Sequence, residues 1–258
     1  MIKKKRETAK KEREMSITSR QEQILALLNA NRFLTVERLA KLTYASPSSI
    51  RRDLAKLQSM CFLKRTHGGA SILDESNQAA PFNNRMLQNA VAKKKIAKKA
   101  EGLLCDGQTV MLDGSSTAAF LVPHIAKHKD IKLFTNNMIT AINAINYGIE
   151  THCIGGNSVN HSAVLSGTQS YRAVLEIFPD ILFFSSHSLD AGGVISDPTE
   201  EENYLRKLML QNARQKVFLC DSEKFNRRAL YTLASLDEVD MAIFDAPFQG
   251  LKTKCKLL

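Results

Sequence analysis

From about Lys93 to its end, the chain alternates between amphipathic helical patterns and short, nearly continuous apolar runs. Such an apolar run is typical of a strand that is buried on both faces. Regular alternation of these strands with helices predicts an α/β fold with a mostly parallel sheet covered by helices. The six expected strands are Thr109–Asp113, Lys132–Asn136, Thr151–Gly155, Ile181–Ser186, Lys216–Asp221 and Met241–Asp245.

The first third of the chain has a different pattern, in which three short amphipathic helices precede a basic hairpin. The first helix carries apolar residues at i, i+3 and i+4 from Ile24. Thr35 is the expected N-cap of the second, and Ser46 followed by Pro47 is a strong start signal for the third. Two short extended runs around a Gly-Gly pair then predict a hairpin. This order predicts a winged helix-turn-helix.

Charge separates the two parts of the chain as clearly as the hydrophobic pattern does. The formal net charge is +10, and residues 1–75 hold 16 Lys and Arg against 8 Asp and Glu, a balance of +8. Residues 76–258 hold 20 against 18. A basic excess on one small unit is typical of proteins that bind a polyanion, because Lys and Arg displace counterions from phosphates.

The third helix has the layout of a recognition helix, which contacts bases and phosphates in the major groove. Ile50 and Leu54 fall on one face, and Ser48 and Arg52 on roughly the opposite one. Asp53 is expected to have a structural role, pairing with a neighbouring arginine. The alternative is a basic helix that contacts only solvent, which the adjacent basic hairpin disfavours. The candidate DNA-binding residues are Thr35, Ser46, Ser48, Ser49, Arg51, Arg52, Lys56, Arg65, His67 and Gly68.

Small and polar residues follow several of the expected strands, at the edge where open parallel sheets bind ligands. A hydroxyl-rich turn begins at Asp113 and opens into an expected helix, Thr117–Ile125, whose first amides favour an anion. Lys224 could balance the charge of a phosphorylated sugar. Ordinary turn chemistry explains the same residues equally well. The candidate effector-binding residues are Asp113, Gly114, Ser115, Ser116, Thr117, Thr135, Asn136, Gly155, Gly156 and Lys224.

The expected organisation is a basic arm (1–18), a winged helix-turn-helix domain (19–73), a linker (74–92) and an α/β domain (93–258). The five cysteines are scattered and make neither a disulfide framework nor a zinc site, and no metal or cofactor is expected. No apolar stretch approaches the ~18 residues of a membrane span, so the expected location is cytoplasmic. The lysines at 93–95, 98 and 99 are expected to form a solvated basic face.

Several motifs resemble the DeoR family of bacterial transcriptional regulators. Residues 46–54 read S-P-S-S-I-R-R-D-L and residues 63–70 read L-K-R-T-H-G-G-A, which are similar to the family's recognition helix and wing. The turn at 113–117, the pairs at 135–136 and 155–156, and the D-x-x-K-F string at 221–225 resemble its sensor domain. Ser115 is a departure, because the family often has Gly there.

The resemblance implies a repressor of sugar-metabolism genes with a Rossmann-like sensor domain similar to ribose-phosphate isomerase. It implies double-stranded operator DNA and a phosphorylated sugar as partners, and a homodimer or homotetramer. An isomerase-like enzyme with an accessory nucleic-acid-binding domain, using Asp113 or Asp221 as its base, is the alternative from another class. A nonspecific nucleic-acid-binding protein is a third. The first 75 residues, for which an isomerase has no use, favour the regulator, and no catalytic residue is expected.

Overall fold

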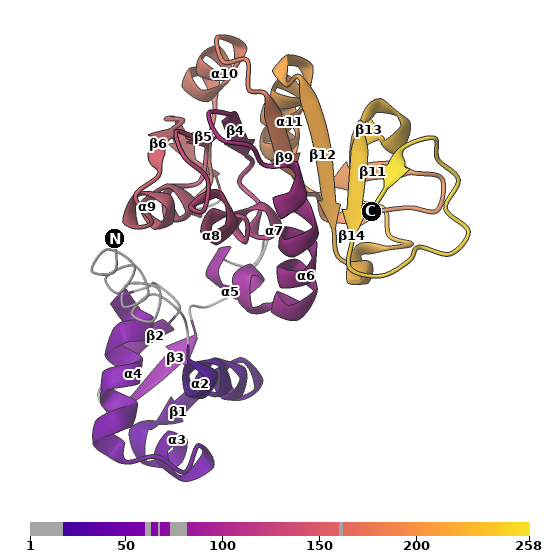
Figure 1. Ribbon diagram of the computed structural model, residues 1–258. Coiled ribbons are helices and arrows are strands. Elements are labelled where there is room, and N and C mark those ends of the chain that lie inside the picture. Colours follow the sequence, from indigo (N-terminus) through magenta and orange to yellow (C-terminus); the bar gives the residue numbers. More distant parts are fainter. Residues whose placement is uncertain (1–17, 60–62, 67, 73–81, 160–161) are drawn as a thin grey trace. The chain divides into compact units, whose positions relative to one another are not determined.

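The computed structural model describes residues 18–59, 63–66, 68–72, 82–159 and 162–258. The chain divides into two compact units, an N-terminal unit of residues 1–87 and a C-terminal unit of residues 88–258 (Figure 1). The expected basic arm up to residue 17, residues 74–81 of the expected linker, and His67 lie outside the described residues. The rest of the expected linker is largely helical, because it contains α5 and the beginning of α6.

The N-terminal unit contains the expected three helices and the hairpin that follows them. Leu39, Ile50 and Leu54 meet in its apolar core and are buried. The hairpin pairs antiparallel, and a further strand, β1, which the sequence pattern did not predict, pairs with its second strand. The elements are α2 (Ser19–Asn31), β1 (Phe33–Thr35), α3 (Val36–Leu42), α4 (Pro47–Ser59), β2 (Leu63–Thr66), β3 (Gly69–Ile72) and α5 (Phe82–Leu87).

The C-terminal unit is built on a parallel sheet whose described strands follow the order β15-β14-β12-β9-β4-β5-β6. All six expected strands are present in this sheet, which confirms the α/β prediction. The sheet strands are β4 (Thr109–Leu112), β5 (Lys132–Thr135), β6 (Glu150–Cys153), β9 (Ile181–Phe184), β12 (Gln215–Cys220), β14 (Met241–Phe244) and β15 (Lys256–Leu257). The helices are α6 (Ala90–Ala100), α7 (Ser116–Ala119), α8 (Val122–Ile125), α9 (Met138–Asn146), α10 (Thr168–Leu175) and α11 (Glu200–Asn212).

Side chains of the sheet alternate between two apolar layers, as successive strand residues must. Val110 and Leu112 of β4 belong to a cluster with α6 and α8, whereas Met111 between them belongs to a cluster with α10 and α11. Short 3-10 turns connect some elements: η1 (Glu101–Leu103), η3 (Ser222–Lys224) and η4 (Leu236–Glu238). Helices therefore cover both faces of the sheet.

Some elements of the C-terminal unit differ from the expectation. The helix expected at Thr117–Ile125 is two short helices, α7 and α8, because Pro123 has no N–H to continue the ladder of hydrogen bonds. Two small antiparallel sheets were not predicted, because their strands are short and partly made of serine and asparagine. Their strands are β7 (Asn157–Ser158), β8 (Leu165–Ser166), β10 (Ser188–Leu189), β11 (Val194–Asp197) and β13 (Tyr231–Ser235).

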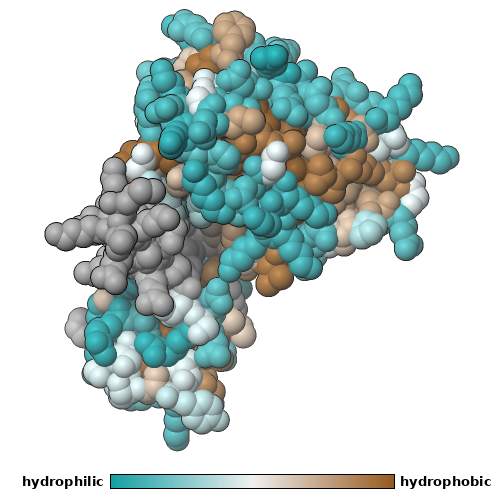
Figure 2. Space-filling model, in the orientation of Figure 1, coloured by the Kyte–Doolittle hydropathy of each residue, from teal (hydrophilic) through white to brown (hydrophobic). Residues whose placement is uncertain are grey.

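On the face shown in Figure 2, hydrophilic residues cover much of the surface and apolar residues gather in separate patches. Among the described residues, we find no helix whose length and apolar character would let it cross a membrane.

Candidate functional site

The start of α4 is fixed by hydroxyl groups, as the sequence predicted. The Ser46 Oγ accepts a hydrogen bond from the Ser49 amide at 3.2 Å, and Pro47 is the first helical residue. The same Oγ lies 2.9 Å from the Ser48 Oγ and 3.0 Å from the Ser49 Oγ. The Arg52 guanidinium donates to the Ser49 Oγ at 3.4 Å. The expected site residues at the start of α4 therefore form one connected surface group.

Two of the candidate arginines lie on the outer face of α4. Arg51 and Arg52 are exposed, and Ile50 and Leu54 on the opposite face are buried. Arg51 lies 4.0 Å from the carboxylate of Glu37 on α3, a separation at which a surface ion pair contributes little. The arginines are thus presented to solvent, which is what a recognition helix requires.

Asp53 has the structural role that the sequence predicted. Its Oδ2 accepts a hydrogen bond from Arg20 Nε at 2.6 Å, and its Oδ1 accepts one from the side-chain amide Nε2 of Gln21 at 2.9 Å. The hydrogen bond to Asp53 raises the pKa of Arg20. Since both donors are on α2, these bonds fix the orientation of α4 within the N-terminal unit.

The remaining DNA candidates lie on the hairpin and around α3 and α4. Arg65 on β2 is exposed, and Gly68 takes a φ of +82° at the turn, which favours glycine. The Thr35 Oγ1 accepts a hydrogen bond from the Arg38 amide, which confirms its expected N-cap position. Lys56 is half-buried near the end of α4.

The strand order of the C-terminal unit identifies where an open parallel sheet binds ligands. From β4 the chain adds β5 and β6 on one side and then returns to β9 on the other side of β4. Ligands of such sheets bind beyond the carboxyl ends of the strands at this reversal. The turn at 113–117 follows β4, and the segment at 185–187 follows β9.

The turn after β4 is organised by Asp113, which is 1% exposed. Its Oδ1 accepts hydrogen bonds from the Ser115 amide at 3.2 Å and the Ser115 hydroxyl at 2.5 Å. The Ser115 Oγ in turn caps α7 by accepting from the Ala118 amide. A side chain at Gly114 would collide with Val164. Ser115, at which the chain departs from the family pattern, therefore serves as the cap of α7, and glycine is needed at the position before it.

Two lysines converge on this turn from different elements. The Nζ of Lys224 donates to the Ser185 Oγ at 2.9 Å and to the Thr117 Oγ1 at 3.4 Å. The Nζ of Lys93, on α6, donates to the Ser116 Oγ at 3.1 Å. Lys93 is only 3% exposed, so the expectation that it belongs to a solvated basic face was wrong. Two ammonium groups therefore contact neighbouring hydroxyls of one turn.

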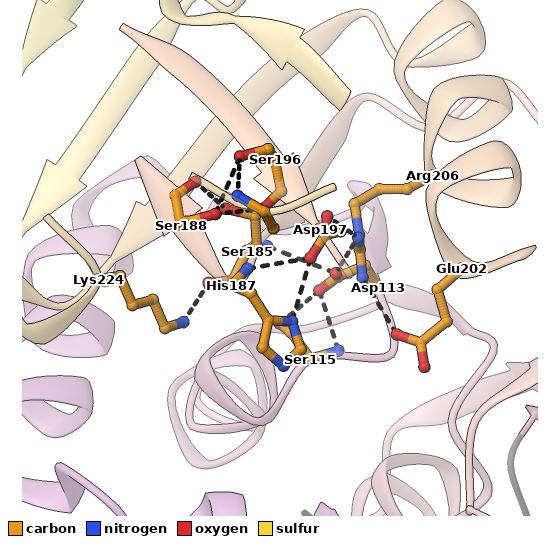
Figure 3. Close-up of polar contacts among 12 residues, drawn as sticks. Asp113, Ser115, Ser185, His187, Ser188, Ser196, Asp197, Glu202, Arg206 and Lys224 are labelled. Carbon is orange, nitrogen blue, oxygen red and sulfur yellow. Dashed lines mark hydrogen bonds and ion pairs between the residues drawn. The ribbon is translucent and has the colours of Figure 1, made fainter. Parts of the chain in front are cut away.

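Asp113 of this turn belongs to a buried network of charged side chains (Figure 3). Arg206 on α11 donates from Nε to the Asp113 Oδ2 at 2.8 Å and from Nη1 to the Asp197 Oδ2 at 2.6 Å. Burial disfavours its charged form, but the carboxylates, first of all Asp197, outweigh this and raise its pKa. Burial likewise disfavours the ionised form of Asp197, but Arg206 and then His187 outweigh it, so the pKa of Asp197 is lowered.

The other effector candidates have mixed roles. Thr135 is buried and its Oγ1 accepts a hydrogen bond from the Asn137 amide. Asn136 donates to the Leu165 carbonyl, while its Oδ1 is buried and has no hydrogen-bond partner in the described part of the chain. Gly156, with a φ of +144°, packs against the backbone of Ser166, so a structural reason accounts for it.

Lys93, Arg206 and Asp197 are among the residues of this site that are absent from the candidates drawn from the sequence. Lys93 could have been found, because it precedes Ile96, Ala97 and Ala100 at the spacing of one helical face. Arg206 and Asp197 carry no such local signal. They meet Asp113 only through the fold.

Comparison with known proteins gives the class of this chain. The family model described as the DeoR C terminal sensor domain matches residues 88–246, and that of the DeoR-like helix-turn-helix domain matches residues 20–76. The HTH-type transcriptional regulator GolR of Listeria innocua is 30% identical over 88% of this chain and 89% of its own length. The putative aga operon transcriptional repressor of Escherichia coli O157:H7 is 30% identical over 88% and 86%.

A more distant relative agrees in class. The glycerol-3-phosphate regulon repressor of Escherichia coli K12 is 25% identical over 90% of this chain and 92% of its own length. Among solved structures, ribose 5-phosphate isomerase A of Methanocaldococcus jannaschii covers 54% of this chain and 55% of its own, with 19% identity and a TM-score of 0.41.

With both of its units matched, the chain is a DNA-binding transcriptional regulator and not an enzyme. It belongs to the DeoR family.

Proposed function

We propose that this regulator represses genes of sugar metabolism and that a phosphorylated sugar, bound at the turn after β4, changes its affinity for operator DNA. The names of two relatives, an aga operon repressor and a glycerol-3-phosphate regulon repressor, support this class of target. Coupling requires that the sugar phosphate bind the DNA-competent and DNA-incompetent states unequally.

The observation that carries the effector proposal is the convergence of Lys93 and Lys224 on the hydroxyls of Ser116, Thr117 and Ser185. Ammonium and hydroxyl groups are the donors that a phosphate needs. The amides of the turn contribute less than the sequence suggested, because those of Ser115 and Ala118 already donate within the turn. The main evidence for an anion site is therefore the two lysines and not the N-terminus of the helix.

The state of the carboxylates favours binding without turnover. Both oxygens of Asp113 accept hydrogen bonds, one from Ser115 and the other from Arg206. Asp221 accepts a hydrogen bond from Asn89 and faces the Lys224 ammonium at 3.3 Å. Asp113 therefore has no oxygen without a hydrogen-bond partner, and the Oδ2 of Asp221, which has no hydrogen-bond partner in the described part of the chain, is held by its ion pair with Lys224. This agrees with a sensor that holds its sugar phosphate unchanged.

For DNA, we propose that α4 is the recognition helix and that the β2–β3 hairpin is the wing. The exposed arginines of α4 and the exposed Arg65 of the hairpin support this assignment. One winged domain contacts too little DNA for tight specific binding, so we propose at least a homodimer, or a homotetramer, on a two-fold operator. We also propose that the protein is cytoplasmic, because a transcriptional regulator must reach its operator DNA.

Replacing Lys224 or Lys93 with methionine is expected to weaken phosphate binding. Each substitution removes one charge-assisted hydrogen bond of about 1.5–3 kcal/mol, which corresponds to roughly 10- to 100-fold in affinity. The measurement is isothermal titration of the full-length protein with inorganic phosphate and with D-ribose 5-phosphate, D-fructose 6-phosphate and D-glucose 6-phosphate. A thermal-shift screen of the same compounds precedes it, since a ligand of the native state raises its melting temperature.

Lys95→Met is the matched control, because Lys95 lies on α6 beside Lys93 but is exposed. It is expected to bind every compound as the unaltered protein does. Equal affinity of all three variants for inorganic phosphate and for the sugar phosphates would contradict an anion site at this turn.

A further inference from the structure

His187 lies between β9 and β10, next to the proposed effector site (Figure 3). Its side chain is 40% exposed, whereas Asp197 behind it is buried. The His187 amide donates to the Asp197 Oδ1 at 3.0 Å, and the ring nitrogen Nδ1 lies 3.2 Å from the same oxygen. The backbone and the ring are thus held by a single carboxylate oxygen, which fixes the position of the imidazole.

The carboxylate also determines which ring nitrogen carries the hydrogen. Asp197 is ionised because Arg206 donates to its other oxygen, so Oδ1 can only accept. The Nδ1 of His187 must therefore be the donor. In the neutral ring this leaves Nε2 as a hydrogen-bond acceptor on the exposed side of the residue.

The segment that carries His187 also contacts the turn after β4 and Lys224. Two residues earlier, the Ser185 amide donates to the Asp113 Oδ2 at 3.4 Å and the Ser185 Oγ accepts from Lys224. In Figure 3 the imidazole projects from this segment on the side where Ser115 lies. An acceptor suits the hydroxyl of a sugar and not an oxygen of its fully ionised phosphate ester group, which offers only lone pairs.

We propose that the Nε2 of His187 accepts a hydrogen bond from a hydroxyl of the bound sugar phosphate and so makes the site select a polyol over a bare phosphate. This inference rests on the proposed function, because it needs the phosphate to lie at Lys93 and Lys224. Asp197 and Arg206 then act as positioning residues that set the tautomer and orientation of the ring.

The test compares three variants of the full-length protein at about pH 8, above the range in which free histidine titrates. His187→Asn keeps a donor near the position of Nδ1 but has nothing at the position of Nε2. His187→Gln can reach the position of Nε2 with its amide. His187→Ala has neither group. The affinities for inorganic phosphate, D-ribose 5-phosphate, D-fructose 6-phosphate and D-glucose 6-phosphate are measured by isothermal titration.

The unaltered protein is expected to prefer at least one of the sugar phosphates over inorganic phosphate. His187→Asn and His187→Ala are expected to lower that preference about tenfold, the effect of one lost hydrogen bond, without changing the affinity for inorganic phosphate. His187→Gln is expected to retain most of it.

Two results would overturn the proposal: a preference that survives in His187→Asn, which would leave His187 a purely structural role, or an unaltered protein that prefers no sugar phosphate. In either case binding of inorganic phosphate would still support the anion site. If the unaltered protein does not bind inorganic phosphate, both the role of His187 and the anion site are overturned.

Discussion

Replacing Arg206 with methionine is expected to lower the free energy of unfolding of the C-terminal unit by about 3–5 kcal/mol, because it leaves buried carboxylates without their cation. Asp113 and Asp197 are each 1% exposed, and each accepts a hydrogen bond from Arg206, which is itself 5% exposed. Methionine fills most of the volume, so the loss reflects charge and hydrogen bonding more than an empty cavity.

This change in the free energy of unfolding can be measured by urea unfolding followed through tyrosine fluorescence. The chain has no tryptophan and five tyrosines, of which only Tyr44 lies outside the C-terminal unit. Arg214→Met is the matched control, because Arg214 is exposed just beyond α11 and should change stability little. Adding Asp113→Asn and Asp197→Asn to Arg206→Met should recover part of the loss. An Arg206→Met protein as stable as the control would mean that the network does not hold this unit together.

This network also changes an expectation for Asp113. From the sequence, Asp113→Ala is expected to weaken sugar binding and leave DNA binding intact. In the structure Asp113 is one of the carboxylates that hold Arg206, so its removal also affects the stability of the C-terminal unit. Lys224 is therefore a cleaner probe of effector binding, because its side chain lies at the edge of the site with 19% exposure.

The sheet was predictable because its strands have a strong local signal. β9 reads I-L-F-F and is buried throughout, and β14 reads M-A-I-F and is buried throughout. The small antiparallel strands lack such runs: β7 is an Asn-Ser pair, and β10 begins with a serine whose hydroxyl is satisfied by Ser196. Their pairing depends on contacts made elsewhere in the fold, which no local pattern reports.

The candidate site was predictable only in part, for a related reason. The turn at Asp113 and the Lys224 segment were found because each directly follows a strand that the sequence identifies. The contact between Asp113 and Arg206 joins residues 93 positions apart, and only the packing of α11 on the sheet brings them together. No motif in the sequence marks His187 as a site residue. It is half-exposed and paired with Asp197, a combination that the sequence alone does not reveal.

Replacing Arg52 with alanine is expected to reduce operator affinity by about 1–3 kcal/mol for each bound subunit, which is the usual cost of a lost base or phosphate contact. If two subunits occupy the two halves of one operator, the two losses add to about 2–6 kcal/mol, and the affinity falls by roughly 30-fold to 2 × 10⁴-fold. Stability should change little, because Arg52 is exposed and its hydrogen bond to Ser49 is long, at 3.4 Å.

The operator for this measurement is DNA that the unaltered protein selects from a random pool, and binding is followed by fluorescence anisotropy with and without competitor DNA. Arg38→Ala is the matched control, because it removes the same charge from an exposed position of the same unit, on α3 instead of α4. It should alter the salt dependence of binding more than the preference for the selected sequence. Arg52→Ala should lower that preference while its affinity for sugar phosphates stays unchanged. If Arg52→Ala and Arg38→Ala weaken selected and competitor DNA by the same factor, α4 does not read the operator, and the basic charge of the N-terminal unit then accounts for binding.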